Sequence, residues 1–549
     1  MKDNLKKHLT QHVVFAVLAI GFMAGLTRTV HASVASPVLT VTTNDLTVTA
    51  SWTSTDSPEG YVLYYAPFPA MDPVYQTDMG TQTSISADLW DGAAIFLAVQ
   101  AYDAGGNTAF SDIKEVFVGS GQPFPGNGDG PGDAPGDGGS DNGGNSTTYE
   151  KSGVYELTGG TDTVSDGTYT ATEADQSGVY VYNAATLTMS GVTIEKSAGD
   201  TSSDDGSNFY GLNAIVLAED ESTINLTNCT LTSTTEGSNG AFAYGEGTTV
   251  NVDSCTINTY GNSSRGVDAT YGGVINVTNT TITTQGDHCG AIASDRYEDN
   301  DPPTINADNV TATTQGDGSP GIYCTGTFTV ANSNLTAEGS EAAAIEGLNS
   351  ITLTNSTISG AKKWGVIIYQ SLSGDSAVGT GTFDMTGGEL INNTTGPVFM
   401  VCNTEAEIYL NGVDITTSGD VLIRATDAAA GDDNINTDWG SAGGNIVFEA
   451  TDQTLEGAVS INENSSLDIT LSGTTTLAGD VEDNGGQVSL TLSEDATWTA
   501  TANSSVDALN GDNLPNAIDA AAGVTIYYES SNSLSGDYSL ASGGVLKQQ

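Results

Sequence analysis

Basic residues are scarce in this 549-residue chain, where 13 Lys and Arg stand against 68 Asp and Glu, for a net charge of −55. A field of this sign repels nucleic acid and anionic membranes, which excludes both as partners. Partners are therefore expected to be neutral, cationic or bridged by a divalent cation. The charge does not exclude a core, because 38% of the residues are hydrophobic and recur in β-type patterns.

Histidine and cysteine are scarce as well. Only His288 lies beyond residue 32, which excludes a zinc site built on a pair of histidines in the mature chain. The five cysteines are an odd number, spread about one per repeat, and indicate neither a disulfide scaffold nor a cysteine zinc site. They are Cys229, Cys255, Cys289, Cys324 and Cys402.

Long apolar runs are absent apart from the 14 residues between Val13 and Leu26. Lysines precede this run and the small-residue site Val30-His31-Ala32 follows it, which is the pattern of a secretory signal peptide. A membrane-spanning helix needs roughly 20 apolar residues. We therefore expect residues 1–32 to be removed, leaving a secreted extracellular or cell-surface protein with no transmembrane span and a net charge of about −58.

Residues 36–118 show alternating apolar and polar runs separated by turn residues, as in residues 46–52 and 61–65, which predicts a small β-sandwich. The segment resembles a fibronectin type III domain. The residues that carry the resemblance are Trp52, Leu89, Phe96 to Asp103, and Gly105-Gly106-Asn107. Ile95 departs from it, because such domains usually have a tyrosine there.

Residues 119–149 are dominated by Gly, Pro, Asp, Asn and Ser, which cannot form a core and predict a flexible linker. Asn127, Asp129 and Asp133 also admit a calcium loop, but the regular spacing of oxygen ligands is missing. We interpret the segment as an acidic linker.

Residues 150–549 contain an internal repeat whose copies begin with apolar, any, apolar. The nine copies start at Leu187, Ile224, Val250, Ile275, Ile305, Phe328, Ile351, Phe383 and Ile408. The fifth place holds Gly or Asn in eight copies and Ser in the remaining one. Gly and Asn tolerate a positive φ. These are Gly191, Asn228, Ser254, Asn279, Asn309, Asn332, Asn355, Gly387 and Gly412. Each copy is therefore predicted to be a strand, a sharp bend and a second strand.

A third strand per repeat is predicted upstream, where many copies have an apolar segment that begins with glycine. These segments start at Gly178, Gly211, Gly266, Gly290, Gly321 and Gly365. Three short strands bury their apolar faces only when successive turns stack about 4.8 Å apart around a common core. After about Asp420 the copies blur, and the end of the chain is predicted to be a cap.

This pattern resembles the right-handed parallel β-helix of the pectate lyase superfold, and in particular adhesin-like β-helix proteins of bacteria. The fold class predicted is all-β, with handedness taken from the resemblance. Lyases of that superfold use a basic residue with calcium, and its hydrolases use clustered aspartates, but neither full set is present. We expect a surface protein that binds a glycan or protein partner rather than an enzyme; a polysaccharide lyase or glycoside hydrolase is the alternative.

The densest polar group comes from two adjacent repeats, and stacking would bring its members onto one surface. It contains Arg265, Asp268, Asp287, His288, Asp295, Arg296, Glu298, Asp299 and Asp301. The group suits ligand binding, a calcium site at Asp295, Glu298, Asp299 and Asp301, or general acid and base chemistry. The interpretation we favour for the group as a whole is an acidic loop with local ion pairs.

A rare cationic and aromatic cluster follows, with Lys363, Trp364 and Tyr369 as candidates for stacking on a sugar ring. A core role for Trp364 is the competing interpretation.

Two further features leave alternatives open. Cys229 and Cys255 occupy the same place in neighbouring copies, where they would form a disulfide or a reduced core pair. Outward Thr-x-Thr ladders resemble those of ice-binding β-solenoids, although threonine also favours any exposed strand.

Overall fold

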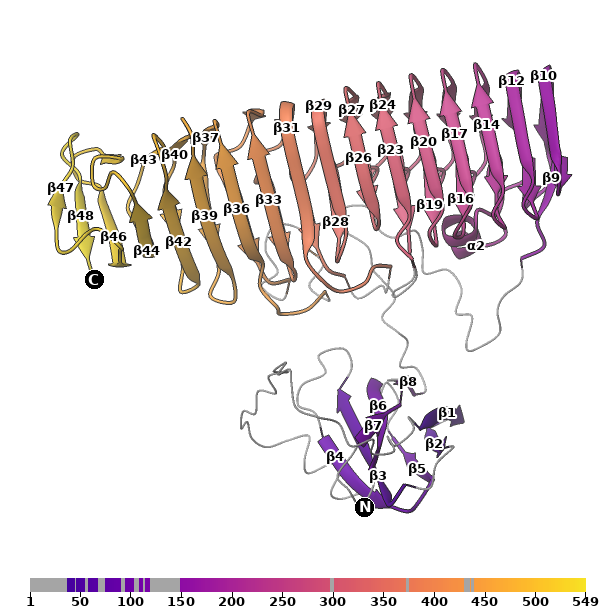
Figure 1. Ribbon diagram of the computed structural model, residues 1–549, viewed down its shortest axis with the longest axis horizontal. Coiled ribbons are helices and arrows are strands. Elements are labelled where there is room, and N and C mark those ends of the chain that lie inside the picture. The colour runs from indigo at the N-terminus through magenta and orange to yellow at the C-terminus, as the bar shows by residue number, and fades with distance from the viewer. Residues whose placement is uncertain are drawn as a thin grey trace, which may run out of the picture. The chain divides into compact units, whose positions relative to one another are not determined.

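The computed structural model describes residues 37–44, 46–54, 58–67, 75–89, 94–102, 108–111, 114–118, 149–296, 301–371, 375–428, 435 and 439–549. The predicted signal peptide and residues 119–148 of the predicted linker lie outside these ranges. The chain divides into two units, Met1–Pro123 and Phe124–Gln549, each described here by itself (Figure 1). Within the described ranges, no helix has the length and apolar character needed to cross a membrane.

The N-terminal unit is a β-sandwich of two antiparallel sheets. One sheet contains β1 (Val38–Asn44), β2 (Thr47–Thr53) and β5 (Ser84–Asp88). The other contains β3 (Gly60–Pro67), β4 (Tyr75–Gly80), β6 (Ala94–Tyr102), β7 (Thr108–Phe110) and β8 (Lys114–Phe117). Alternate residues of both sheets meet in one core, which includes Trp52 from β2 and Val99 from β6. Membership of the fibronectin type III family stays a prediction.

The larger unit consists of stacked turns whose strands pair in parallel with those of the next turn (Figure 1). A 13-stranded sheet takes one strand from each of its turns. Its strands are β9 (Ser152–Thr158), β11 (Gln176–Tyr182), β13 (Val216–Ala218), β16 (Ala241–Tyr244), β19 (Val267–Thr270), β22 (Ile292–Asp295), β25 (Ile322–Cys324), β28 (Ala343–Glu346), β30 (Val366–Tyr369), β32 (Phe399–Cys402), β35 (Val421–Thr426), β38 (Ala458–Ile461) and β41 (Val481–Glu482). This sheet is made of the strands that were predicted as the third strand of each repeat.

The repeat copies themselves belong to a 23-stranded sheet, in which some turns give two strands and others one long strand that spans the bend. Its strands are β10 (Thr161–Ala171), β12 (Thr186–Lys196), β14 (Thr223–Thr227), β15 (Thr230–Ser233), β17 (Thr249–Asp253), β18 (Thr256–Thr259), β20 (Val274–Thr278), β21 (Thr281–Thr284), β23 (Thr304–Asp308), β24 (Thr311–Thr314), β26 (Thr327–Ala331), β27 (Asn334–Ala337), β29 (Ser350–Gly360), β31 (Gly381–Asn392), β33 (Glu405–Asn411), β34 (Asp414–Thr417), β36 (Asn445–Thr451), β39 (Ser466–Ser472), β42 (Gln487–Leu492), β44 (Ser504–Gly511), β46 (Thr525–Ser530), β47 (Tyr538–Ser539) and β48 (Val545–Gln548). Four C-terminal turns add β37 (Thr454–Glu456), β40 (Thr476–Ala478), β43 (Thr497–Ala500) and β45 (Ile518–Ala520).

The predicted bend is present in all nine copies. The nine fifth-place residues have φ between 49° and 67°, including Asn228 at 53° and Asn355 at 49°. Neighbouring copies pair in register, so that Ile224 lies opposite Val250 and Ile275 lies opposite Ile305. The predicted fold class, an all-β chain whose larger part is a right-handed parallel β-helix, is confirmed.

Two ladders of asparagine amides run along the stack, and the second of them was not predicted. At the bends, the Asn309 amide donates to Asn279 Oδ1 over 2.8 Å, and the Asn279 amide donates to Asp253 Oδ1 over 2.8 Å. At the second place of four successive copies, Asn225, Asn251, Asn276 and Asn306 are joined by bonds of 2.8–2.9 Å. Each ladder satisfies polar groups turn after turn.

Replacing Asn309 with valine is expected to lower the free energy of unfolding by about 2 kcal/mol, because a β-branched residue is strained at its φ of 54°. Asn309→Gly keeps the backbone conformation and loses only the amide bond, so its effect should be smaller. The measurement is urea unfolding, with Thr311→Val on the adjacent strand as the control. Equal losses for valine and glycine would contradict the role assigned to the bend.

Two sequence predictions about strands were wrong. Gly211 does not begin a strand; its φ of 69° caps the helix α2 (Asp204–Tyr210), and the strand of that turn begins at Val216. The segment at Gly290 is shifted by one residue, because Val267 pairs with Ile292 and Gly266 therefore lies level with Ala291. One additional residue between the glycine and the strand shifts Gly290 relative to Gly266, while the two strands stay in register.

The turns also continue beyond Asp420 more regularly than the sequence indicated. β36, β39, β42, β44 and β46 pair in parallel one after another, and only β47 and β48 close the stack with an antiparallel pair. The corners there are Asp452, Gly473 and Glu494, with φ of 53°, 62° and 58°. Asp452 and Glu494 hide the repeat, because the Asn and Gly signal is missing at two of these three corners.

Candidate ligand-binding site

The outer face of the 13-stranded sheet carries the candidate site. Residues alternate along each strand, so Val179 and Val181 of β11 enter the main core, while Tyr180 between them joins a separate outer cluster. The neighbours of Tyr180 in successive turns are Leu217, Phe242, Asp268, Ala293, Tyr323, Ala344, Ile367 and Met400. In the middle turns this outward column is itself buried.

A charged cluster forms at the centre of this face. Arg265 Nη2 lies 2.8 Å from Asp295 Oδ2, and its Nη1 lies 3.3 Å from Asp268 Oδ2. Nη1 also donates to Asn208 Oδ1 over 2.6 Å. Arg265 is 2% exposed and the two aspartates are 0% exposed. The cluster joins two adjacent turns to a helix, since Asp268 lies on β19, Asp295 on β22 and Asn208 on α2.

Helix α2 holds this arrangement in place beside β16 and β19 (Figure 1). Ser203 caps its N-terminus by accepting from the backbone N–H of Gly206, and two aspartates occupy its first turn. Thr270 Oγ1 donates to the carbonyl of Phe209 over 2.9 Å, which ties the helix to β19. This docking brings Asn208 to Arg265.

Burial governs the protonation of the charged cluster. It raises the pKa of Asp268, and it raises the pKa of Asp295 to about 6, although Arg265 acts in the opposite direction on both carboxyl groups. Burial lowers the pKa of Arg265, but the two carboxylates outweigh it and the net change is a rise. Arg265 therefore stays protonated and cannot serve as the base of a lyase reaction.

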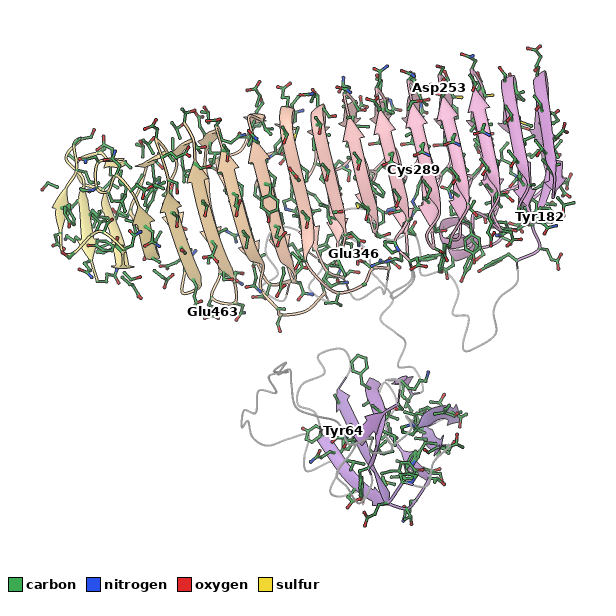
Figure 2. The ribbon with its side chains drawn as sticks, viewed as in Figure 1. Tyr64, Tyr182, Asp253, Cys289, Glu346 and Glu463 are labelled. Carbon is green, nitrogen blue, oxygen red and sulfur yellow. The ribbon has the colours of Figure 1, made fainter. Side chains whose placement is uncertain are left out.

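A second buried carboxyl group, Glu346, ends β28 on the same outer face and was missed from the sequence. Tyr323 Oη donates to Glu346 Oε2 over 3.0 Å, and both the backbone and the hydroxyl of Ser371 donate to Oε1. Burial raises the pKa of Glu346. Tyr182 and Glu346, both labelled in Figure 2, lie along the same edge of the stacked turns.

The other described residues of the predicted polar group lie at a corner or directly after a strand. Asp287 and His288 lie at the corner before β22, where Asp287 Oδ1 accepts from the backbone of Asp317 over 2.8 Å. Arg296 is buried directly after β22, with 4% exposed. The predicted group is therefore spread over a corner and a strand.

The predicted calcium ligands do not form a site among the described residues. Asp295 is paired with Arg265, Asp301 is exposed, and Glu298 and Asp299 lie outside the described ranges. In the part of the chain that the structure describes, no three metal-ligating side chains gather around a common point. Because Glu298 and Asp299 are not described, the calcium site stays a prediction.

The predicted sugar platform around Trp364 is buried. Lys363 Nζ lies 5.5 Å above the Trp364 ring, but Trp364 is 1% exposed and Tyr369 is 2% exposed. Tyr369 stacks on Trp439, with ring centroids 4.4 Å apart and an interplanar angle of 21°. The structure thus favours the core role for Trp364. Trp439 comes from the insertion after Asp427, which no repeat pattern covers.

A group of half-exposed rings, here called the tyrosine patch, lies on the same face in the first turns. It consists of Tyr149, Tyr180, Tyr182, Tyr210, Tyr244 and Tyr271, of which Tyr180 is buried and the others are partly exposed. Tyr180 and Tyr182 stack at 4.6 Å, and Tyr210 and Tyr271 stack at 5.6 Å. The alternation of Tyr180 and Tyr182 on one strand was the available signal for this patch.

The cysteines and the threonine ladders are structural features of the stack. All five cysteines are free and buried, and the backbone N–H of Cys229 donates to Cys255 Sγ over 3.3 Å, which favours the reduced pair. Thr230, Thr256 and Thr281 lie opposite one another on exposed strand positions. Ice binding by this face stays a prediction.

No family model and no curated protein matches this chain. Among solved structures, it is similar to pectate lyase Pel3 from Pectobacterium carotovorum, with 10% identity, 70% of this chain and 92% of that chain covered, and a TM-score of 0.14. It is similar to pectate lyase PelI from Erwinia chrysanthemi in complex with tetragalacturonic acid, with 11% identity, coverage of 58% and 85%, and a TM-score of 0.13. It is also similar to tailspike protein gp49 from Pseudomonas phage LKA1, with 14% identity, 91% of this chain and 65% of that chain covered, and a TM-score of 0.21. The fold assignment rests on the strand pairing.

Proposed function

We propose that this chain is a secreted, adhesin-like surface protein that binds an extracellular glycan on the outer face of the 13-stranded sheet. The observation that carries the proposal is the tyrosine patch, in which five of the six tyrosines are partly exposed, whereas the outer column from Leu217 to Met400 is buried. Aromatic faces suit the C–H faces of sugar rings. The N-terminal β-sandwich would serve as a spacer or anchor.

Cleavage of an extracellular polysaccharide is the second candidate, favoured by the buried carboxyl groups of Asp295 and Glu346. A pKa near 6 for Asp295 suits a general acid at neutral pH. Two observations weigh against it: Arg265 is held protonated between two carboxylates, and Asp295 and Glu346 are 0% and 1% exposed. A substrate would need to reach groups that the fold covers.

The secreted chain, starting at residue 33, is expected to bind at least one polysaccharide in a glycan panel and to release no product. Binding should persist from 0.15 to 0.5 M NaCl, roughly, because stacking is not screened as a charge interaction is. Surface binding to immobilised glycans measures it, with a glycan-free surface as the control.

Incubation of the same panel, with and without calcium, measures unsaturated and reducing ends. Their release would favour the enzyme instead. Absence of binding to every glycan, together with unchanged cell attachment when the protein is deleted, would contradict the proposed function.

A further inference from the structure

We infer that the tyrosine patch is a binding site for uncharged pyranose units and that Tyr271 is its main stacking residue. The inference rests on the proposed function and deepens it, because it names both the site and the class of sugar. Three independent features support it: the packing of the rings, the backbone conformation of Tyr271 and the distribution of charge.

The rings of the patch pack against one another in a continuous row. Tyr271 lies nearly parallel to Tyr210, at 24°, and edge-on to Tyr244, at 69°, with centroids 5.6 and 5.3 Å apart. Tyr149 continues the row at 5.3 Å from Tyr210. These four tyrosines are each of intermediate exposure, so the group is neither a closed core nor a set of isolated surface residues.

Tyr271 occupies a backbone position that does not suit a tyrosine. It follows the last residue of β19 and lies level with Gly245, Asp220 and Asn183 in the preceding turns. Those residues have φ of 90°, 52° and 64°, and Tyr271 has φ of 50°. Gly, Asp and Asn tolerate the left-handed region, whereas a bulky residue there is strained. Strain retained at a half-exposed ring points to a function for the ring.

The charges around the patch favour an uncharged ligand. Lys151 forms an ion pair with Glu219 and lies 4.7 Å from the centre of the Tyr244 ring, and Tyr180 Oη also donates to Glu219. The cation is therefore already neutralised within the patch. Asp220 and Glu221 beside it are exposed, and a uronic acid polymer would meet carboxylates of its own sign.

The chemistry of a pyranose matches the aromatic rings and phenol groups of the patch. Its polarised C–H bonds would lie on the negative ring faces, and its hydroxyl groups would exchange hydrogen bonds with the phenols. Burial raises the pKa of Tyr271 and of Tyr244, so both phenols stay protonated and able to donate throughout the physiological range. Binding should therefore be independent of pH from about 5 to 9.

Tyr271→Gly tests the inference with a readout that a structural role would not produce. Affinity for an uncharged hexasaccharide should fall at least tenfold, roughly the worth of one lost aromatic contact. Stability should stay the same or rise, because glycine relieves the strain at φ 50°. Titration calorimetry with β-1,4-linked hexamers of glucose, mannose and galactose measures affinity, and thermal unfolding measures stability. Tyr271→Asn is the second variant, since asparagine tolerates this conformation.

The control is Tyr260→Ala, which removes a ring that is 43% exposed at a corner outside the patch and should leave affinity unchanged. Glycan binding that persists undiminished in both Tyr271 variants would overturn the patch and leave the proposed function standing. Preference for a galacturonic acid hexamer would overturn the uncharged class. Failure of the unmodified chain to bind any glycan would overturn both proposals.

Discussion

Arg265→Met is expected to lower the free energy of unfolding by about 3–5 kcal/mol at pH 8. The substitution keeps much of the side-chain volume but removes the guanidinium that lies 2.8 Å from Asp295 and 3.3 Å from Asp268. Both carboxylates are then left buried and unpaired, and Asn208 loses its donor at 2.6 Å. Urea unfolding of the full chain measures the loss.

The dependence of that loss on pH separates charge from packing. Without Arg265 the pKa values of Asp268 and Asp295 should rise further, so protonation at pH 5 neutralises them and the loss should shrink there. The triple variant with Asp268→Asn and Asp295→Asn should recover most of the stability at pH 8. An equal loss at both pH values, with no recovery in the triple variant, would show that Arg265 acts only by filling space.

The fold could be predicted because its bends impose a requirement that individual residues reveal. A corner with φ near 50° selects Asn or Gly, so Asn228, Asn279 and Asn355 mark the turns whatever the loops between them do. Where that signal is replaced, as at Glu494, the repeat is present but hidden. Loop length was the other obstacle, since it placed Gly290 one residue out of register.

The candidate site could be predicted only in part, and the reason is the origin of its residues. Arg265, Asp268 and Asp295 were identified because they belong to the densest polar group of two adjacent repeats. Asn208 and Trp439 come from a helix and an insertion, whose positions the repeat does not fix. The alternation of residues along a strand also shows which side chains point outward, but not that helix α2 and neighbouring segments then bury them.

Glu341 is a buried glutamate that occupies the position of Arg265 three turns later. Glu341 stands two residues before β28 as Arg265 stands two residues before β19. It is 0% exposed, and Ser340 Oγ donates to its Oε2 over 2.9 Å, while its Oε1 has no hydrogen-bond partner among the described residues. Burial raises the pKa of Glu341 to about 7. The folded chain therefore keeps this proton where the unfolded chain has released it.

Glu341→Gln is expected to stabilise the protein by about 3 kcal/mol at pH 8 and to change little near pH 4.5. The raised pKa means that the folded state binds more protons than the unfolded state between pH 4.5 and about 7, so wild-type stability falls as the pH rises through this window. Glutamine stays neutral and removes that contribution. The difference between the two unfolding curves isolates Glu341 from Asp295, with the exposed Glu338→Gln as the control. A variant less stable than wild type at pH 8 would show that the charged form of Glu341 is itself stabilised by the fold.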